Sequence, residues 1–155
     1  MSKLLEVKNL RVSYHTYAGE VQSVRGISFE VNEGETLAVV GESGCGKTVT
    51  AKSLMRLIQT PPGEIKDGSE ILYKGNDILK MNNEQLRHFR GAEISMIFQD
   101  PMTSLNPTMT IGKQIAESLI IHRNMKKHEA MDEAIKMLKL VNIPRSEEHT
   151  SELQS

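Results

Sequence analysis

The chain has 155 residues, which is enough for one domain or part of one, because domains commonly contain about 100–200 residues. Its 19 basic and 20 acidic residues exclude a strongly basic surface that would by itself indicate nucleic acid. The single cysteine excludes an internal disulfide and a cysteine-based metal cage. The longest aliphatic runs are far shorter than the about 20 residues of a bilayer span, and residues 1–20 lack a secretory-signal pattern. We therefore expect a reducing cytoplasm as the compartment.

The first half of the chain predicts strands and one helix. Residues 4–14 and 21–31 carry apolar residues at strand spacing. Residues 36–40 are apolar without alternation, which is typical of a strand covered on both faces in a parallel sheet. A glycine-rich loop follows, and then a helix of about a dozen residues that begins near Gly46 and ends before the prolines at 61–62.

The second half predicts two further strands and three helices. Residues 71–73 indicate a short strand, and a short helix follows with Leu86 and Phe89 facing inward. Residues 94–98 are typical of another buried strand, which a loop broken by prolines follows. Thr110 can cap the next helix. The last helix has its apolar residues at Met131, Ala134, Ile135, Leu138 and Val141.

The glycine-rich loop matches the phosphate-binding pattern G-x-x-x-x-G-K-[ST], between an apolar segment and a helix, as the pattern requires. Glycines allow backbone N–H groups to turn inward around an anion, and the helix N-terminus adds positive charge. The lysine reaches the β- and γ-phosphates and the threonine hydroxyl reaches Mg²⁺. We expect the ATP-binding residues here to be Gly41, Glu42, Ser43, Gly44, Cys45, Gly46, Lys47 and Thr48. Cys45 is either a small side chain that fits the loop or a thiol that alkylation would modify.

Residues 94–107, ISMIFQDPMTSLNP, resemble the Q-loop of ABC transporter ATPase subunits, and in particular the oligopeptide/dipeptide importer branch. The segments 5–10, 24–29 and 40–48 fit the same branch. The resemblance covers residues 1–144. It implies an α/β fold of the P-loop NTPase class, an ABC-type nucleotide-binding domain that is truncated. Such a domain would have an antiparallel β subdomain, an incomplete parallel core sheet and the start of a helical subdomain.

The resemblance also implies roles for single residues. Lys47 and Gln99 would be catalytic, and Gln99 would sense the γ-phosphate and, with Thr48, contact Mg²⁺. Tyr14 would stack on the adenine, and Tyr17 is a weaker candidate for that position. A half-buried strand aromatic is the alternative for either tyrosine.

By the same resemblance, the parent protein would hydrolyse ATP to drive import of peptides or related small solutes. It would be peripheral on the cytoplasmic face of the cell membrane. Its partners would be transmembrane permease subunits, a second ATPase subunit and, indirectly, an extracytoplasmic solute-binding protein, without nucleic acid. The alternatives are a soluble ABC ATPase without a transport role and a nucleotide-binding fragment without turnover.

The chain contains no LSGGQ-like signature, no aliphatic strand that ends in Asp-Glu and no later switch histidine. The chain alone would therefore bind nucleotide without useful hydrolysis. Residues 145–155 are polar and aperiodic, and they can be back-translated into DNA that resembles a common short-read sequencing adapter. We thus expect residues 1–144 to be the N-terminal part of an ABC ATPase domain and residues 145–155 to be a non-native tail from adapter read-through.

Overall fold

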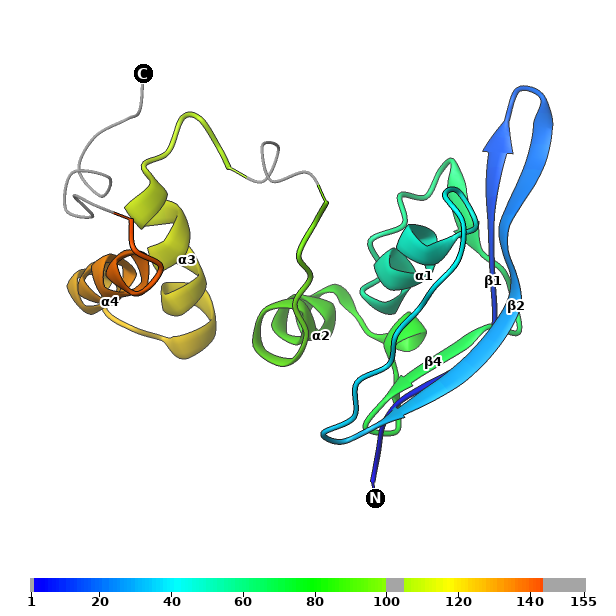
Figure 1. Ribbon diagram of the computed structural model, residues 1–155, viewed down its shortest axis with the longest axis horizontal. Helices are drawn as coiled ribbons and strands as arrows, with labels where there is room; N and C mark the ends of the chain where they lie inside the picture. Colours follow the sequence, from blue (N-terminus) through cyan, green and yellow to red (C-terminus); the bar gives the residue numbers. More distant parts are fainter. Residues whose placement is uncertain (1, 100–104, 144–155) are drawn as a thin grey trace. The chain divides into compact units, whose positions relative to one another are not determined.

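The computed structural model describes residues 2–99 and 105–143 (Figure 1). The chain divides into two compact units, Met1–Leu86 and Arg87–Ser155. The proposed tail at 145–155 and the middle of the Q-loop-like segment, Asp100–Ser104, lie outside the described residues.

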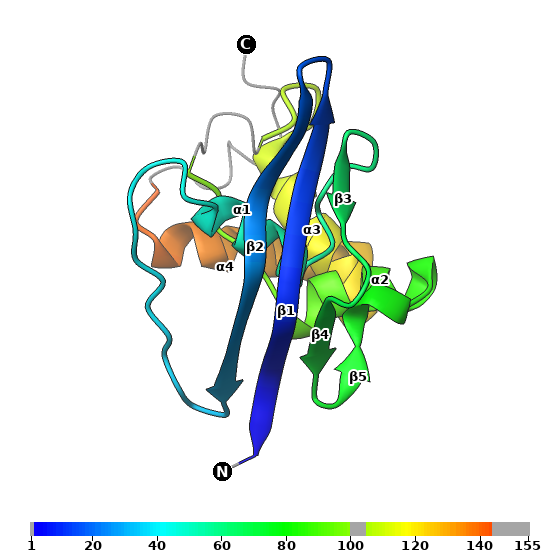
Figure 2. The same cartoon turned by 90° about the vertical axis from the view of Figure 1, so that its right-hand side faces the viewer.

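The first unit is built on a long antiparallel hairpin, β1 (Lys3–Thr16) and β2 (Gly19–Asn32), which confirms the two strands expected at the start of the chain. β1 is the central strand of the sheet, because its other edge pairs with β3 (Gly63–Ile65) and β4 (Glu70–Tyr73) (Figure 2). The short β5 (Asn76–Asp77) extends the sheet beyond β4.

The core of this unit lies on one face of the hairpin. Leu10 and Val12 of β1 are fully buried, and Val24 of β2 lies opposite Val12. This face is covered by α1 (Lys47–Leu54) and by the 3₁₀ helix η1 (Ile78–Lys80), whose Ile78 is also fully buried. Alternate residues of a strand point to the same face, which is why these β1 positions are two apart.

Helix α1 has 8 residues, so the expectation of about a dozen is wrong in length. The helix ends because Arg56 takes a left-handed conformation, with φ 49°. The Arg56 guanidinium then donates to the carbonyl oxygens of Met81 at 2.7 Å and Ile78 at 3.4 Å. These bonds tie the end of α1 to η1 and so fix the helix on the sheet.

The strand expected over residues 36–40 is not formed. Leu37, Val39 and Val40 are 43%, 55% and 87% exposed, and no strand among the described residues pairs with this segment. A strand needs neighbours for its backbone hydrogen bonds, and the described sheet consists of antiparallel strands around β1.

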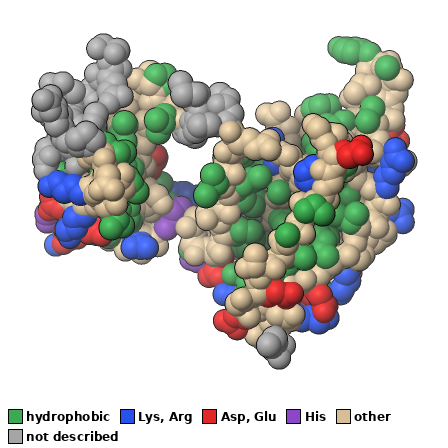
Figure 3. Space-filling model, in the orientation of Figure 1, with side chains coloured by type: hydrophobic (Ala, Val, Ile, Leu, Met, Phe, Trp, Pro, Cys, Tyr) green, Lys and Arg blue, Asp and Glu red, His purple; other side chains and the backbone are tan. Residues whose placement is uncertain are grey.

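The strand expected over residues 94–98 is not formed either, for the same physical reason. Ile97 is 98% exposed and Phe98 is 47% exposed, and the segment has no ladder partner among the described residues. The described part of the chain thus contains the antiparallel subdomain of the expected fold and its helices, without a parallel pair of strands. Hydrophobic side chains are correspondingly visible on the surface of both units (Figure 3).

The second unit is helical. α2 (Asn83–His88) begins in the first unit and ends in the second, where the π-helix η2 (Phe89–Glu93) follows it. Leu86 and Phe89 are buried as expected. α3 (Ile111–Arg123) begins at Thr110, whose hydroxyl accepts the Lys113 N–H at 3.4 Å, which confirms the predicted cap.

α4 (Lys127–Leu140) packs along α3 in the second unit. Ala116 and Leu119 of α3 and Ala130 of α4 form the buried cluster between these helices. Of the five apolar positions expected in the last helix, Ala134 and Leu138 are buried, whereas Val141 lies beyond the helix end and is 64% exposed. None of the helices in the described part of the chain has both the length and the apolarity of a membrane span.

Candidate functional site: the phosphate-binding loop

The loop over residues 41–48 joins the exposed 36–40 segment to α1. Gly46 is the residue that starts the helix, with φ 98° and ψ 2°, a conformation that glycine adopts without strain. It also packs against β2, since a Cβ at Gly46 would lie 2.5 Å from the carbonyl oxygen of Ser23. The loop is thus seated on the sheet at a point where only glycine fits.

Lys47, the first residue of α1, folds back over the loop. Its ammonium donates to the carbonyl oxygens of Gly41 at 2.7 Å and Glu42 at 2.6 Å, and it lies 3.6 Å from the sulfur of Cys45. A carbonyl oxygen carries only a partial charge, whereas a phosphate oxygen carries a formal negative charge and so attracts the Lys47 ammonium more strongly. The lysine therefore occupies a position from which it can exchange these carbonyls for phosphate oxygens.

The rest of the loop is open to solvent. Cys45 is exposed, and its backbone N–H donates to the carbonyl oxygen of Glu42 at 3.4 Å. Gly46, the N-cap residue of α1, makes no side-chain cap bond, and Thr48 in the first turn of the helix is exposed. Uncapped helix N–H groups are suitable donors for an anion, and a hydroxyl oxygen is a hard ligand of the kind that Mg²⁺ prefers. The residues present therefore fit a phosphate with an associated Mg²⁺ ion.

The two tyrosines differ in their surroundings. Tyr14 lies on β1 opposite Val21 and Gly63 and is half-buried, with its ring edge against Gly63. Tyr17 lies in the turn between β1 and β2 and is fully exposed. The ring of Tyr17 is thus open to solvent, whereas the ring of Tyr14 packs against Gly63.

Gln99 is exposed and belongs to the second unit, whereas the loop belongs to the first. The structure brings Gly41–Thr48 together, and the assignment of Gln99 to the same site continues to rest on the sequence resemblance. Ser23 is a site residue that the sequence does not reveal. It supports Gly46 through its backbone carbonyl, so no side-chain signal could have found it.

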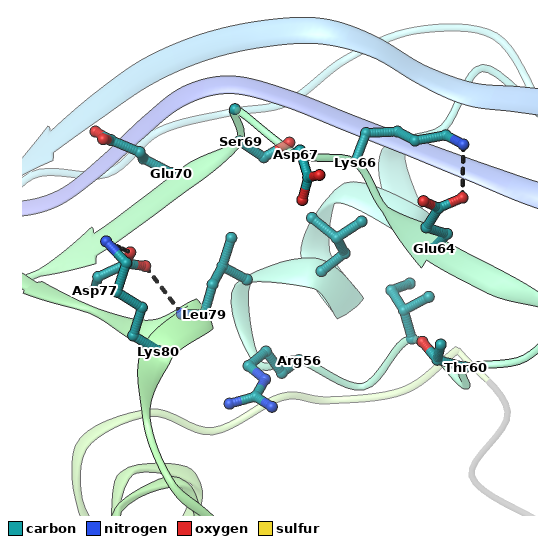
Figure 4. Close-up of a pocket in the computed structure, with 13 residues that line it drawn as sticks. Arg56, Thr60, Glu64, Lys66, Asp67, Ser69, Glu70, Asp77, Leu79 and Lys80 are labelled. Carbon is teal, nitrogen blue, oxygen red and sulfur yellow. Dashed lines mark hydrogen bonds and ion pairs between the residues drawn. The ribbon is translucent and has the colours of Figure 1, made fainter.

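A separate cavity of about 740 Å³ lies between the end of α1 and strands β3–β5, and none of the loop residues lines it (Figure 4). Its wall carries charges of both signs. In this wall the Lys66 ammonium lies 2.6 Å from the Glu64 carboxylate, and this bond, with His15 second, holds the pKa of Glu64 below its ordinary value. Paired charges of this kind stabilise the sheet surface and give no sign of a nucleotide site. Among the described residues, no group of three His, Cys, Asp or Glu side chains could hold a metal ion.

Comparison with known proteins identifies the family. The profile described as "ABC transporter" matches residues 24–153. The oligopeptide transport ATP-binding protein OppD of Bacillus subtilis is 51% identical over 152 residues, which are 98% of this chain and 42% of that protein. The dipeptide transport ATP-binding protein DppD of Lactococcus lactis is 53% identical over 151 residues, which are 97% of this chain and 43% of that protein.

Solved structures agree on the fold. The ATP-binding cassette MJ0796, in a dimeric post-hydrolysis state with ADP and Pi, superposes with a TM-score of 0.78 at 20% identity. The superposition covers 98% of this chain and 63% of that one. The chain thus spans less than half the length of the curated relatives named above, and its fold is that of an ABC ATPase cassette. On the profile match, the high identity to these relatives and the seated phosphate-binding loop, this chain belongs to the ABC transporter family.

Proposed function

We propose that this chain binds ATP at Gly41–Thr48 and that its full-length protein hydrolyses ATP to energise import of peptides or related small solutes. The main observation behind the proposal is the position of the Lys47 ammonium, which donates to two backbone carbonyls of the loop. Gly46 packs against β2 and so fixes the loop on the sheet. The relatives support the solute class, since they are named as oligopeptide, dipeptide and glutathione transport or import ATP-binding proteins. Nothing in these names favours an ATPase without a transport role.

In this proposal the residues of the loop have separate tasks. The backbone N–H groups of residues 41–46 and the N-terminus of α1 surround the phosphates, and Lys47 neutralises the β- and γ-phosphates. The hydroxyl of Thr48 and the amide of Gln99 hold Mg²⁺. Tyr14 stacks on the adenine, with Tyr17 as the alternative.

The proposed partners follow from the relatives. ATP-binding subunits of this kind act with transmembrane permease subunits, and the MJ0796 structures are described as dimeric, which supports a second ATPase subunit. We propose that the full-length protein is a peripheral subunit on the cytoplasmic face of the membrane. An extracytoplasmic solute-binding protein would be an indirect partner. We further propose that residues 1–144 are the family segment and that residues 145–155 are a non-native tail.

The test is ATP binding by the full-length protein and its Lys47→Ala variant, measured by isothermal titration calorimetry. Loss of a charged hydrogen-bond donor costs about 1.5–3 kcal/mol, so we expect the Kd for ATP to rise at least about tenfold. Lys52→Ala, on the same helix, is the matched control and should bind ATP normally. An unchanged Kd in a correctly folded Lys47→Ala protein would refute the proposal.

A second measurement addresses Mg²⁺. Thr48→Val keeps the shape of the side chain and removes the hydroxyl oxygen. We expect this variant to bind ATP without Mg²⁺ as the unaltered protein does, and to lose most of the gain in affinity that Mg²⁺ gives. If added Mg²⁺ strengthened ATP binding equally in both proteins, Thr48 would not be a metal ligand.

A further inference from the structure

A second cavity, of about 600 Å³, lies over the β1–β2 hairpin in the first unit, and none of the residues of the phosphate-binding loop lines it. Arg11 stands between Leu10 and Val12, which are fully buried, so its side chain lies on the face of the hairpin opposite the core. The wall of the cavity contains three basic and three acidic residues, which are Arg11, Arg25, Lys66, Glu20, Glu64 and Asp67.

Two arginines lie next to each other at one end of this cavity. Arg11 of β1 and Arg25 of β2 are directly opposite in the ladder, and both are exposed. Neither arginine forms an ion pair with any residue that the structure describes. Like charges at directly opposite positions of an antiparallel pair are destabilising. An anion between the two guanidinium groups would therefore remove a repulsion.

The Arg11 guanidinium is held in place by the residues around it. Its Nε donates to the Asn9 Oδ1 at 3.1 Å, and the Asn9 N–H donates to the Ser28 Oγ at 2.8 Å. A Cβ at Gly26 would lie 3.0 Å from the Asn9 Oδ1 and 3.7 Å from the Arg11 Nε, so a glycine leaves room for this bond. The terminal N–H groups of Arg11 thus remain as donors in a fixed position. A guanidinium with free terminal N–H groups is well suited to bind a carboxylate through two parallel bonds.

An acidic end of the cavity lies further along the hairpin. Glu64 of β3 is opposite the residue that follows Arg11 by two positions. The Lys66 ammonium lies 2.6 Å from the Glu64 carboxylate and 2.9 Å from the Glu20 carboxylate. The bond with this ammonium is the first cause that keeps the pKa of both carboxyl groups below its ordinary value, so both are ionised at neutral pH. One ammonium between two carboxylates leaves one excess negative charge at this end when His15, which also bonds Glu64, is neutral.

The separation of the two ends matches the length of a short peptide. Two residues along a strand cover about 7 Å, and an extended dipeptide has about the same length between its ammonium and its carboxylate. A molecule with one group of each kind can therefore contact the arginines and the acidic end at the same time. A polyanion, such as a nucleic acid or an anionic membrane surface, would be repelled by the carboxylates of Glu20 and Glu64.

We propose that this cavity binds a small zwitterion of the size of a short peptide. Its carboxylate lies between Arg11 and Arg25, and its ammonium lies against Glu20 and Glu64. The cavity uses none of the residues of the phosphate-binding loop, so this site adds peptide binding to the proposed ATP binding and does not depend on it.

The experiment is isothermal titration calorimetry of the full-length protein with the dipeptide alanylalanine. We expect saturable binding. The Kd should rise at least about tenfold for N-acetyl-alanylalanine, which lacks the ammonium, and for alanylalanine amide, which lacks the carboxylate. Absence of alanylalanine binding, or equal Kd values for the three compounds, would overturn the inference.

Variants test the two arginines. Arg11→Gln and Arg25→Gln should each raise the Kd for alanylalanine at least about tenfold. Lys8→Gln is the matched control, because Lys8 is on the same strand, forms an ion pair with Glu70 and does not line the cavity. This control should bind alanylalanine normally. An unchanged Kd in both arginine variants, or an equal rise in Lys8→Gln, would contradict the proposed site.

Two further readouts separate binding from a structural role. Without peptide, Arg25→Gln should have a Tm no lower than that of the unaltered protein, because it removes the repulsion between the arginines. Arg25→Gln should also keep its Kd for ATP, whereas Lys47→Ala should lose ATP binding and keep alanylalanine binding. Failure of the proposed function and failure of this inference are therefore separate results. A lower Tm or weaker ATP binding in Arg25→Gln would show that Arg25 supports the fold and would overturn the inference.

Discussion

The Cα atom of Gly46 packs directly against the backbone of Ser23, so closely that a Cβ at Gly46 would lie 2.5 Å from the Ser23 carbonyl oxygen. A contact at this distance with a rigid strand cannot be relieved by a rotation of a side chain. The strand β2 therefore fixes the distance between the sheet and the phosphate-binding loop. The positions of the loop and of the first turn of α1 depend on this contact.

Gly46→Ala should consequently displace the loop and weaken ATP binding by at least about tenfold, through steric overlap and a φ of 98° that alanine adopts only with strain. Gly44→Ala is the matched control, since its φ is also positive but a Cβ there would meet nothing within 4 Å. The Kd for ATP should rise less in Gly44→Ala than in Gly46→Ala. Equal effects of the two substitutions would mean that the contact with Ser23 is unimportant.

Cys45 offers a chemical probe of the same loop, because it is exposed and its sulfur lies 3.6 Å from the Lys47 ammonium. N-ethylmaleimide should alkylate Cys45, and the added group should block ATP binding. Saturating Mg-ATP should slow the labelling at least about tenfold by mass action. Peptide mass spectrometry measures the rate, with Cys45→Ser as the control, and equal labelling with and without nucleotide would contradict the prediction.

The adenine position can be assigned by comparing Tyr14→Ala with Tyr17→Ala. Loss of a stacking ring costs about 1–3 kcal/mol, so the variant that removes the stacking residue should raise the Kd for ATP about fivefold or more. We expect this effect for Tyr14. Tyr17 is fully exposed and Tyr14 packs on Gly63, so only Tyr14→Ala should also lower the Tm. If Tyr17→Ala alone weakened binding, the stacking role would belong to Tyr17.

The pair of Glu64 and Lys66 predicts a pH dependence. The ion pair with Lys66, which Figure 4 shows, is the first cause that keeps the pKa of Glu64 below its ordinary value, and the bond with His15 is the second. The stabilisation from ionised Glu64 is therefore fully present above its ordinary pKa and is lost as the pH falls through the lowered pKa. An NMR titration of the Glu64 carboxyl should show the lowered pKa, and Lys66→Met should raise it. Lys136→Met, which breaks a pair on α4, should leave the Glu64 titration unchanged.

The exposed apolar segments predict poor solubility for the chain of 155 residues when it is expressed as written. Val40 and Ile97 are 87% and 98% exposed, and large exposed apolar patches favour association. Replacing both with lysine should raise the soluble yield of this chain, as measured by light scattering after centrifugation. A monodisperse monomer with cooperative unfolding in the unaltered chain would show the prediction to be wrong.

Local patterns account for most of what could be predicted. The phosphate-binding loop, the β1–β2 hairpin and the cap at Thr110 depend on residues that are near one another in sequence, so their signals are complete within short segments. The end of α1 differs from the expectation because Arg56 bonds to Met81 and Ile78, which lie more than 20 positions further along the chain, fix it.

By itself, the sequence predicted the class of chemistry, since the glycine spacing, the lysine and the threonine of residues 41–48 match a phosphate-binding pattern that follows an apolar segment and precedes a helix. Only the tertiary structure decided which backbone groups support this loop and which apolar segments remain exposed. The seat of Gly46 on Ser23 involves a backbone group, which carries no sequence signal. The segments 36–40 and 94–98 have the composition of buried strands, but a strand forms only where another strand completes its hydrogen bonds.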